Sequence, residues 1–283
     1  EFIKVTNKIN FKVTLPCLLV QDLMNTDFRQ EFDGKYILYC MIVTSLCFFA
    51  TWALAKAFLK DKTLVPELVQ GSFRGSAAVL GTAFVLNMYG DTGMVPLMII
   101  GAVPLYNIYS VIVLTIESPR REEIEGSPVK NTIKGIATNP IIIGIVVGLL
   151  LSIFRVDFPL MIDNTIGNIA KMATPLALLA IGGSFEFSNA LKKMGPAVTG
   201  SAIKLVIMAA VFLPVAVWLG YRDAKLMALV IMLGSPTTPS CYIMAKNMKC
   251  DGTLTSSMVV ITTMMSAFTI TLIVFVLRTL GYL

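Results

Sequence analysis

Long apolar runs, separated by short polar stretches, fill almost the whole chain. A helix needs about twenty mostly apolar residues to cross a bilayer. Nine segments approach or reach this length, at 9–26, 36–58, 66–89, 93–116, 138–154, 160–185, 197–219, 224–247 and 254–279. The pattern therefore predicts an all-α polytopic membrane protein.

The second half of the chain repeats landmarks of the first half at an offset of about 160 residues. Basic, proline and apolar positions recur together, as do an Asn-Met pair and a following aspartate. The matched residues are Lys12, Pro16, Leu19 and Phe28 with Lys171, Pro175, Leu178 and Phe187, and Asn87, Met88 and Asp91 with Asn247, Met248 and Asp251. The near-constant offset predicts two structural repeats.

The number of spans in each half predicts how the repeats are oriented. The second half supplies five segments and the first half four, because the counterpart of 138–154 would lie before residue 1. We expect that the first helix is missing from this chain, and that the whole protein has inverted five-helix repeats, as secondary transporters do. The expected organisation is a first repeat at 1–116, a cytoplasmic connecting loop at 117–137 and a second, inverted repeat at 138–283.

Two segments of the predicted spans are unable to form regular helix. Arg74-Gly75-Ser76 lies within 66–89, and the matching part of 224–247 contains Pro236 and Pro239. A proline in a helix removes a backbone donor and clashes with the preceding turn. Irregular backbone within a bilayer is tolerated where protein encloses it or where it lines water. We predict that the two broken helices cross.

A crossing of this kind predicts an anion site, because helix N-termini at the breaks direct N–H groups and a positive dipole end toward the gap. An arginine within a span also needs a partner or a wet cavity. Asn107 is a deep amide on the next span. The predicted substrate-binding residues are Arg74, Gly75, Ser76, Asn107, Ser235, Pro236, Thr237, Thr238 and Ser240.

Other polar and proline positions within or near spans have two interpretations. Pro16 and Pro175 are predicted breaks or hinges, as are the two prolines of the second break. Lys204 lies about seven residues into its span, where it either snorkels or takes part in ion coupling. Asp22 and Asp163 could carry a coupling proton or sodium ion, or could simply be wet. Glu67 opens its span and is expected to be wet.

Composition and loop charge set the class and the sidedness of the protein. The chain is 56% hydrophobic and only 14% charged, against roughly a quarter charged residues in soluble domains. One alternating set of loops carries 13 basic residues and the other set six. The richer set is cytoplasmic by the positive-inside rule, which places the C-terminus outside the cell membrane. The basic residues are scattered singly, so no nucleic-acid partner is expected.

Enzymatic and metal chemistry find little support in the sequence. The chain has no histidine, which excludes imidazole relays, Ser-His-Asp triads and histidine metal sites. The five cysteines have no metal-ligand spacing and are expected to be free thiols. We predict no enzyme, no metal and no cofactor, although transport could be coupled to H⁺ or Na⁺.

Several stretches resemble the auxin efflux carrier family, particularly its bacterial malate and organic-acid permeases. The most specific stretch is Pro175-Leu176-Ala177-Leu178-Leu179-Ala180-Ile181-Gly182; others are 15–19, 74–76 and 235–237, followed by Ala245-Lys246 and Asp251. The resemblance covers the chain from Lys8 onward. It implies ten helices, broken fourth and ninth helices in a mobile part, elevator-like alternating access and a homodimer.

The first break departs from the family pattern. Ser76 replaces the usual asparagine, and the later proline is absent from Leu80-Gly81-Thr82-Ala83. The substrate of the relatives is therefore not transferable. The predicted function is a secondary transporter of small organic anions, with dicarboxylates such as malate or malonate favoured. The alternatives are a sodium-coupled anion symporter of the bile-acid type and a non-transporting membrane sensor.

Overall fold

The computed structural model describes residues 1–24, 33–117, 137–154, 156 and 158–283, and every element in these residues is helical. The α-helices are α1 (Phe2–Ile9), α2 (Leu15–Met24), α3 (Gly34–Phe58), α4 (Val65–Phe73), α5 (Ala77–Tyr89), α6 (Val95–Ile116), α8 (Pro140–Phe154), α9 (Leu160–Lys171), α10 (Ala173–Ser184), α11 (Phe187–Lys192), α12 (Met194–Ala202), α13 (Met208–Trp218), α14 (Asp223–Gly234), α15 (Ser240–Asn247) and α16 (Thr253–Thr279). A π-helical turn, η1 (Asn10–Thr14), joins α1 to α2, another, η4 (Ile203–Ile207), joins α12 to α13, and a 3₁₀ turn, η2 (Lys62–Leu64), precedes α4.

The described residues confirm an all-α fold, and several of its helices are candidate membrane spans. Five described stretches are long and apolar enough to cross a membrane: Gly34–Phe58, Val95–Ile116, Leu160–Ser184, Met194–Trp218 and Thr253–Thr279. Each of the remaining predicted segments coincides with a shorter helix or with two consecutive helices. The predicted connecting loop, 117–137, lies outside the described residues except at its two ends.

Two pairs of consecutive helices are interrupted where the sequence contains glycine and proline. After α4, Arg74 adopts an extended conformation (φ −90°, ψ 130°), and α5 begins only at Ala77. After α14, Ser235 is extended (φ −67°, ψ 150°), and the stretch ending in Pro239 precedes α15. Proline lacks the N–H that would continue the helix, so the second interruption follows directly from the sequence.

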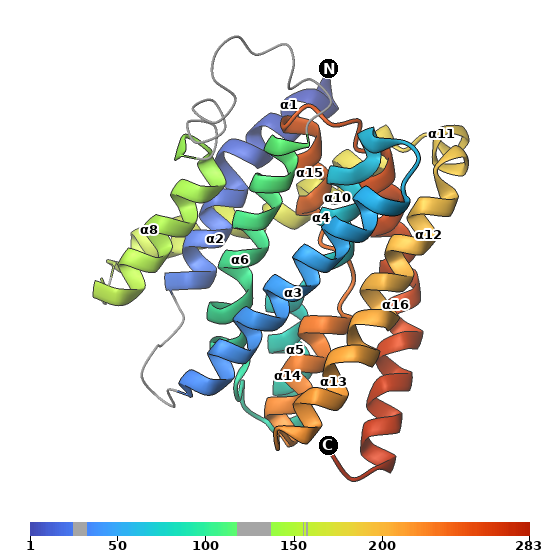
Figure 1. Cartoon of the computed structure of the whole chain (residues 1–283). Helices are drawn as coiled ribbons and strands as arrows, with labels where there is room; N and C mark the ends of the chain where they lie inside the picture. Colours follow the sequence, from blue (N-terminus) through green and yellow to red (C-terminus); the bar gives the residue numbers. More distant parts are fainter. Residues whose placement is uncertain (25–32, 118–136, 155, 157) are drawn as a thin grey trace.

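The two interrupted pairs run in opposite directions. In Figure 1, α4 and α15 lie in the upper half of the molecule and α5 and α14 in the lower half. α5 packs against α14, and α4 packs against α15. The labelled N- and C-termini lie at opposite ends of the molecule (Figure 1).

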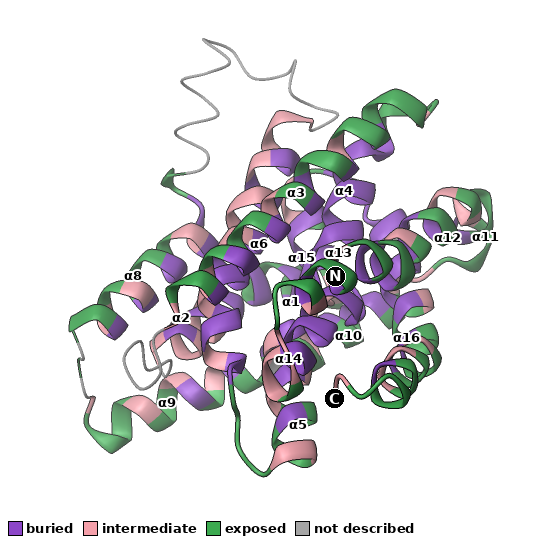
Figure 2. Cartoon of the chain, turned by 60° about the horizontal axis from the view of Figure 1, so that its bottom comes forward, coloured by how far each residue is buried: buried purple, intermediate pink, exposed green. Residues whose placement is uncertain are grey.

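Three of these interrupted helices, α4, α14 and α15, lie in the interior of the bundle, whereas α5 has exposed side chains such as Phe84 and Leu86. Every residue of α4 is buried, as is the stretch of α14 from Leu226 to Gly234. Figure 2 shows that exposed residues gather on peripheral helices such as α9 and α16. Their large apolar side chains, for example Phe268 and Phe275, suit the hydrocarbon of a bilayer rather than water.

Pro16 and Pro175 lie near the starts of two helices, α2 and α10. Helical backbone continues through both junctions, at Leu15 and at Met172, so each proline removes a donor from a continuing helical run. Each proline follows a local irregularity, the π-helical turn η1 before α2 and the junction at Met172 before α10. The side chain of Asn10 donates to the carbonyl of Ala173 (2.9 Å) and joins the two irregular places. Whether they act as hinges stays a prediction.

Candidate functional site

The two interruptions contact each other directly in the interior. The Ser76 N–H donates to the carbonyl of Pro236 (2.9 Å). At Gly75 a Cβ atom would lie 2.3 Å from Ser235 Oγ and 2.9 Å from Lys204 Nζ. Real Cβ atoms do not approach other atoms this closely, so glycine at this position allows the two segments to meet.

Thr237 ties the second interruption to its surroundings. Its N–H donates to Thr262 Oγ1 (3.0 Å) and its hydroxyl donates to the carbonyl of Gly71 (2.7 Å). The N–H groups of Ser76 and Thr237 are therefore engaged within the protein and do not face the gap, and the expectation that the N-termini of α5 and α15 direct N–H groups toward it stays a prediction. Buried backbone donors need partners in every state of the site, and here the protein itself supplies them.

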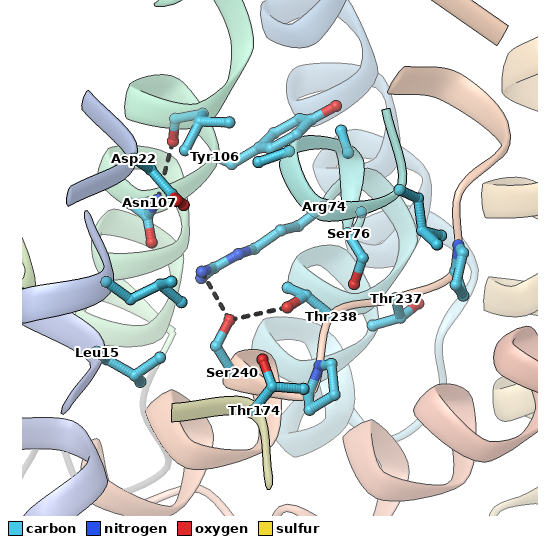
Figure 3. Close-up of a pocket in the computed structure, with 18 of the residues that line it drawn as sticks. Leu15, Asp22, Arg74, Ser76, Tyr106, Asn107, Thr174, Thr237, Thr238 and Ser240 are labelled. Carbon is cyan, nitrogen blue, oxygen red and sulfur yellow. Dashed lines mark hydrogen bonds between the residues drawn. The ribbon is translucent and has the colours of Figure 1, made fainter. Parts of the chain in front are cut away.

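A cavity of about 270 Å³ lies beside the contact between the interruptions. Its wall combines the residues of both interruptions with side chains from α2, α6, α8, α10 and α16 (Figure 3). The lining residues are Leu15, Leu18, Leu19, Asp22, Arg74, Gly75, Ser76, Ala77, Ala78, Leu80, Val103, Tyr106, Asn107, Ile141, Thr174, Leu178, Pro236, Thr237, Thr238, Pro239, Ser240 and Thr263. The structure therefore brings together all of the predicted substrate-binding residues except Ser235, which is buried behind Gly75.

Arg74 supplies the positive charge of this cavity. Only 6% of the residue is exposed. Its guanidinium donates through Nη2 to Ser240 Oγ (2.8 Å) and through Nη1 to Met244 Sδ (2.6 Å). A thioether is a weak acceptor, and no carboxylate among the described residues forms an ion pair with Arg74. A buried charge is costly unless an opposite charge accompanies it, so the cavity wall is suited to an anion.

Oxygen acceptors lie on the α6 side of the same cavity. Asn107 is buried and donates through Nδ2 to the carbonyl of Val103 (2.9 Å), whereas its Oδ1 has no partner among the described residues. Asp22, from α2, also lines the cavity, and Figure 3 shows it beside Asn107. The sequence placed Asp22 only near the end of a span; its position in the cavity depends on how α2 packs.

Two of the three coupling candidates, Lys204 and Asp163, lie outside this lining. Lys204 is completely buried, and its Nζ donates to the carbonyls of Met232 (3.2 Å) and Leu233 (3.0 Å) in the last turn of α14. An ammonium in this position satisfies carbonyls that the helix end leaves free and faces its negative dipole end. Snorkelling is therefore wrong for Lys204. Asp163 lies in the first turn of α9 and does not line the cavity.

Glu67 was expected to be wet, and this expectation is wrong. The residue is 1% exposed. Its carboxylate accepts hydrogen bonds from the Gly252 N–H (2.8 Å), the Thr255 N–H (2.9 Å) and the Thr255 hydroxyl (2.9 Å). A carboxylate at the N-terminus of α16 satisfies free donors and interacts favourably with the helix dipole. No local signal could have identified this partner, because it is more than 180 residues away in the sequence.

Comparison with known proteins gives the family. The family described as "Membrane transport protein" matches residues 2–274. The chain is also 22% identical over 277 residues to a Rhizobium meliloti (strain 1021) protein named "Putative malonate transporter", across 94% of this chain and 84% of that protein. The match to the family spans nearly the whole sequence and confirms the resemblance to auxin efflux carriers. The chain belongs to the membrane transport protein family.

Proposed function

We propose that this membrane transport protein is a secondary transporter that carries small organic anions across the cell membrane, with dicarboxylates such as malonate or malate favoured. The observation that carries the proposal is the cavity beside the two interruptions, into which a buried arginine brings a positive charge without an ion-pair partner among the described residues. The name of the Rhizobium meliloti relative supports malonate as the first substrate to test.

We propose that the interrupted helices belong to inverted repeats and move together as the mobile part of an elevator-like transporter. The opposite directions of the pairs α4–α5 and α14–α15 support this arrangement (Figure 1). So does the contact between the interruptions, because a substrate held there would move with both pairs. Transporters of this kind use irregular backbone at the repeat interface to hold the substrate. A homodimer would anchor the remaining helices in the bilayer.

The proposed topology places the end of the molecule that carries Lys192 and Lys246 in the cytoplasm and the C-terminus outside. Single cysteines at positions 192 and 222, in a variant without the five native cysteines, test this orientation. An impermeant thiol reagent applied to intact cells should label position 222 and leave position 192 unlabelled. The reverse pattern would contradict the proposed topology.

Coupling to H⁺ or Na⁺ belongs to the same proposal. Asp22 is the one acidic residue in the described cavity lining, so a coupling ion that travels with the substrate would meet it. A sodium-coupled symporter of the bile-acid type would require sodium for any uptake, whereas a proton-coupled carrier would respond to a pH gradient alone.

Counterflow into proteoliposomes tests the function. Vesicles preloaded with unlabelled malonate, malate or indole-acetate are exposed to the labelled compounds, with and without a pH or sodium gradient. We expect accumulation of labelled malonate that an excess of unlabelled anion abolishes, against none in empty liposomes. A purified, folded protein that binds these anions but gives no counterflow would instead be a sensor, and one that neither binds nor transports any of them would overturn the anion proposal.

A further inference from the structure

The cavity has hydrogen-bond donors on one side and acceptors on the other. We propose that the species this protein recognises is a monocarboxylate anion with a hydrogen-bond donor at its far end, such as a half-protonated dicarboxylate or a hydroxy acid, and not a dianion. This inference rests on the proposed function and narrows its substrate class. Asn107 is the residue that accepts a hydrogen bond from this donor.

The donor side is formed by Arg74 and the start of α15. A guanidinium has five N–H donors and no acceptor, and within the part of the chain that the structure describes two donor atoms of Arg74 are engaged, by Ser240 and by Met244. Ser240 Oγ also lies 3.2 Å from Thr238 Oγ1. Figure 3 shows these polar groups converging on the cavity from the crossing. A guanidinium is able to bind a planar carboxylate through two parallel hydrogen bonds.

The acceptor side is fixed by the way Asn107 is held. Its amide nitrogen donates to the carbonyl of Val103 in the preceding turn. The reversed amide would bring Oδ1 against that carbonyl, two acceptors without a proton between them, so the hydrogen bond fixes the orientation. Oδ1 is thereby left buried and without a partner among the described residues. A buried acceptor of this kind costs free energy until a donor reaches it.

The charges around the cavity also favour a monoanion over a dianion. Its titratable lining side chains are Arg74, from between α4 and α5, Asp22, from α2, and Tyr106, from α6; α8, α10, α15 and α16 contribute none to the lining. The Tyr106 hydroxyl donates to the carbonyl of Met232 (3.1 Å). A second ionised carboxylate would meet Asp22 and Asn107 Oδ1, a like charge and an acceptor. A protonated carboxyl, a hydroxyl or an amide would donate to them.

Two derivatives of malonate that carry the same charge test the effect of the hydrogen-bond donor by itself. The half-amide of malonate is a monoanion with N–H donors at its far end, whereas the monomethyl ester is a monoanion of similar size with acceptors alone. Binding of both to the purified wild-type protein is measured by calorimetry. We expect the half-amide to bind at least about tenfold more tightly than the ester, the scale of leaving a buried acceptor unpaired.

The pH dependence gives a second readout in the same protein. Malonate should bind more weakly as pH rises through its second ionisation, whereas affinity for the half-amide should change much less over that range. In Asp22→Asn, which replaces a carboxylate with an amide that is able to donate, the decline for malonate should become shallower. Asn107→Leu has a similar volume without the acceptor and should reduce the preference for the half-amide over the ester to about twofold or less.

Equal affinity of the wild-type protein for the ester and the half-amide would overturn the inference, even if Asn107→Leu fails to fold. In that case malonate binding itself would leave the proposed function standing. If neither derivative binds, nor malonate at any pH, the proposed function fails and this inference fails with it.

Discussion

Replacing Arg74 with glutamine separates a binding role from a structural role. The change removes the charge from the cavity and keeps a polar side chain. In the structure the guanidinium is buried, and its bonds go to one hydroxyl and one thioether. Because the desolvation of this charge is not repaid by an ion pair among the described residues, its removal should leave the stability of the protein unchanged or raise it.

The affinity for the anion should change in the opposite sense. A carboxylate bound to the guanidinium would lose at least one charge-assisted bond, worth about 1.5–3 kcal/mol. This corresponds to a dissociation constant for malonate that is roughly tenfold to 150-fold larger. Arg74→Lys keeps the charge but loses the planar fork, so its affinity should lie between those of the wild type and Arg74→Gln.

The assay combines titration calorimetry with malonate and thermal unfolding of the same protein in detergent. Met244→Leu is the matched control, since Met244 contacts the same guanidinium but does not line the cavity. It should bind malonate within about twofold of the wild type, well under the 1.4 kcal/mol that a tenfold change requires. Arg74→Gln protein that is less stable than the wild type but binds malonate equally well would refute the reasoning and make Arg74 a structural residue.

Variants at three further positions test contacts that hold the helices in place. Lys204→Met leaves two carbonyls of the last turn of α14 without their donor and should lower stability by about 1–3 kcal/mol, more than Lys204→Gln, in thermal unfolding; equal stability of Lys204→Met and wild type would contradict this. Glu67→Gln weakens the three bonds to the start of α16 and should cost about 1.5–3 kcal/mol in the same assay, whereas an unchanged midpoint would mean that the carboxylate is dispensable. Asp33 caps α3 through the Tyr36 N–H (3.1 Å), so Asp33→Ala should cost about 0.5–2 kcal/mol. The hydrogen bond from Lys225 (2.9 Å) lowers the pKa of the Asp33 carboxyl. The ionised Asp33 carboxylate therefore stabilises the folded protein at neutral pH, and this stabilisation is lost as pH falls through the lowered pKa. Unfolding midpoints of Asp33→Asn should depend less on acid pH than those of the wild type.

Local chemistry explains why so much of the fold was predictable. The spans follow from runs of apolar residues whose length matches a bilayer, and the runs at 36–58, 93–116 and 254–279 differ from the observed helices by only a few residues. The interruption after α14 follows from two prolines, and the one after α4 was predicted from glycine and serine beside Arg74. Such features depend on residues close together in the sequence, and they also indicated eight of the residues that line the cavity.

Contacts between distant segments decided the rest. Glu67 bonds to residues 185 and 188 positions away, and Lys204 holds carbonyls of another helix. Whether each of these charges is wet or buried depends on which helix covers it, and hydropathy along one helix does not contain that information. The same is true of Asp22, whose distance from Arg74 and Asn107 is set by the packing of α2 against its neighbours. The sequence alone therefore determined where the apolar helices lie and where two pairs of them are interrupted, because these depend on local hydrophobicity and backbone chemistry. Only the tertiary structure decided which polar groups face the cavity and which bond to protein, because a buried polar group takes whichever partner the folded chain brings within reach.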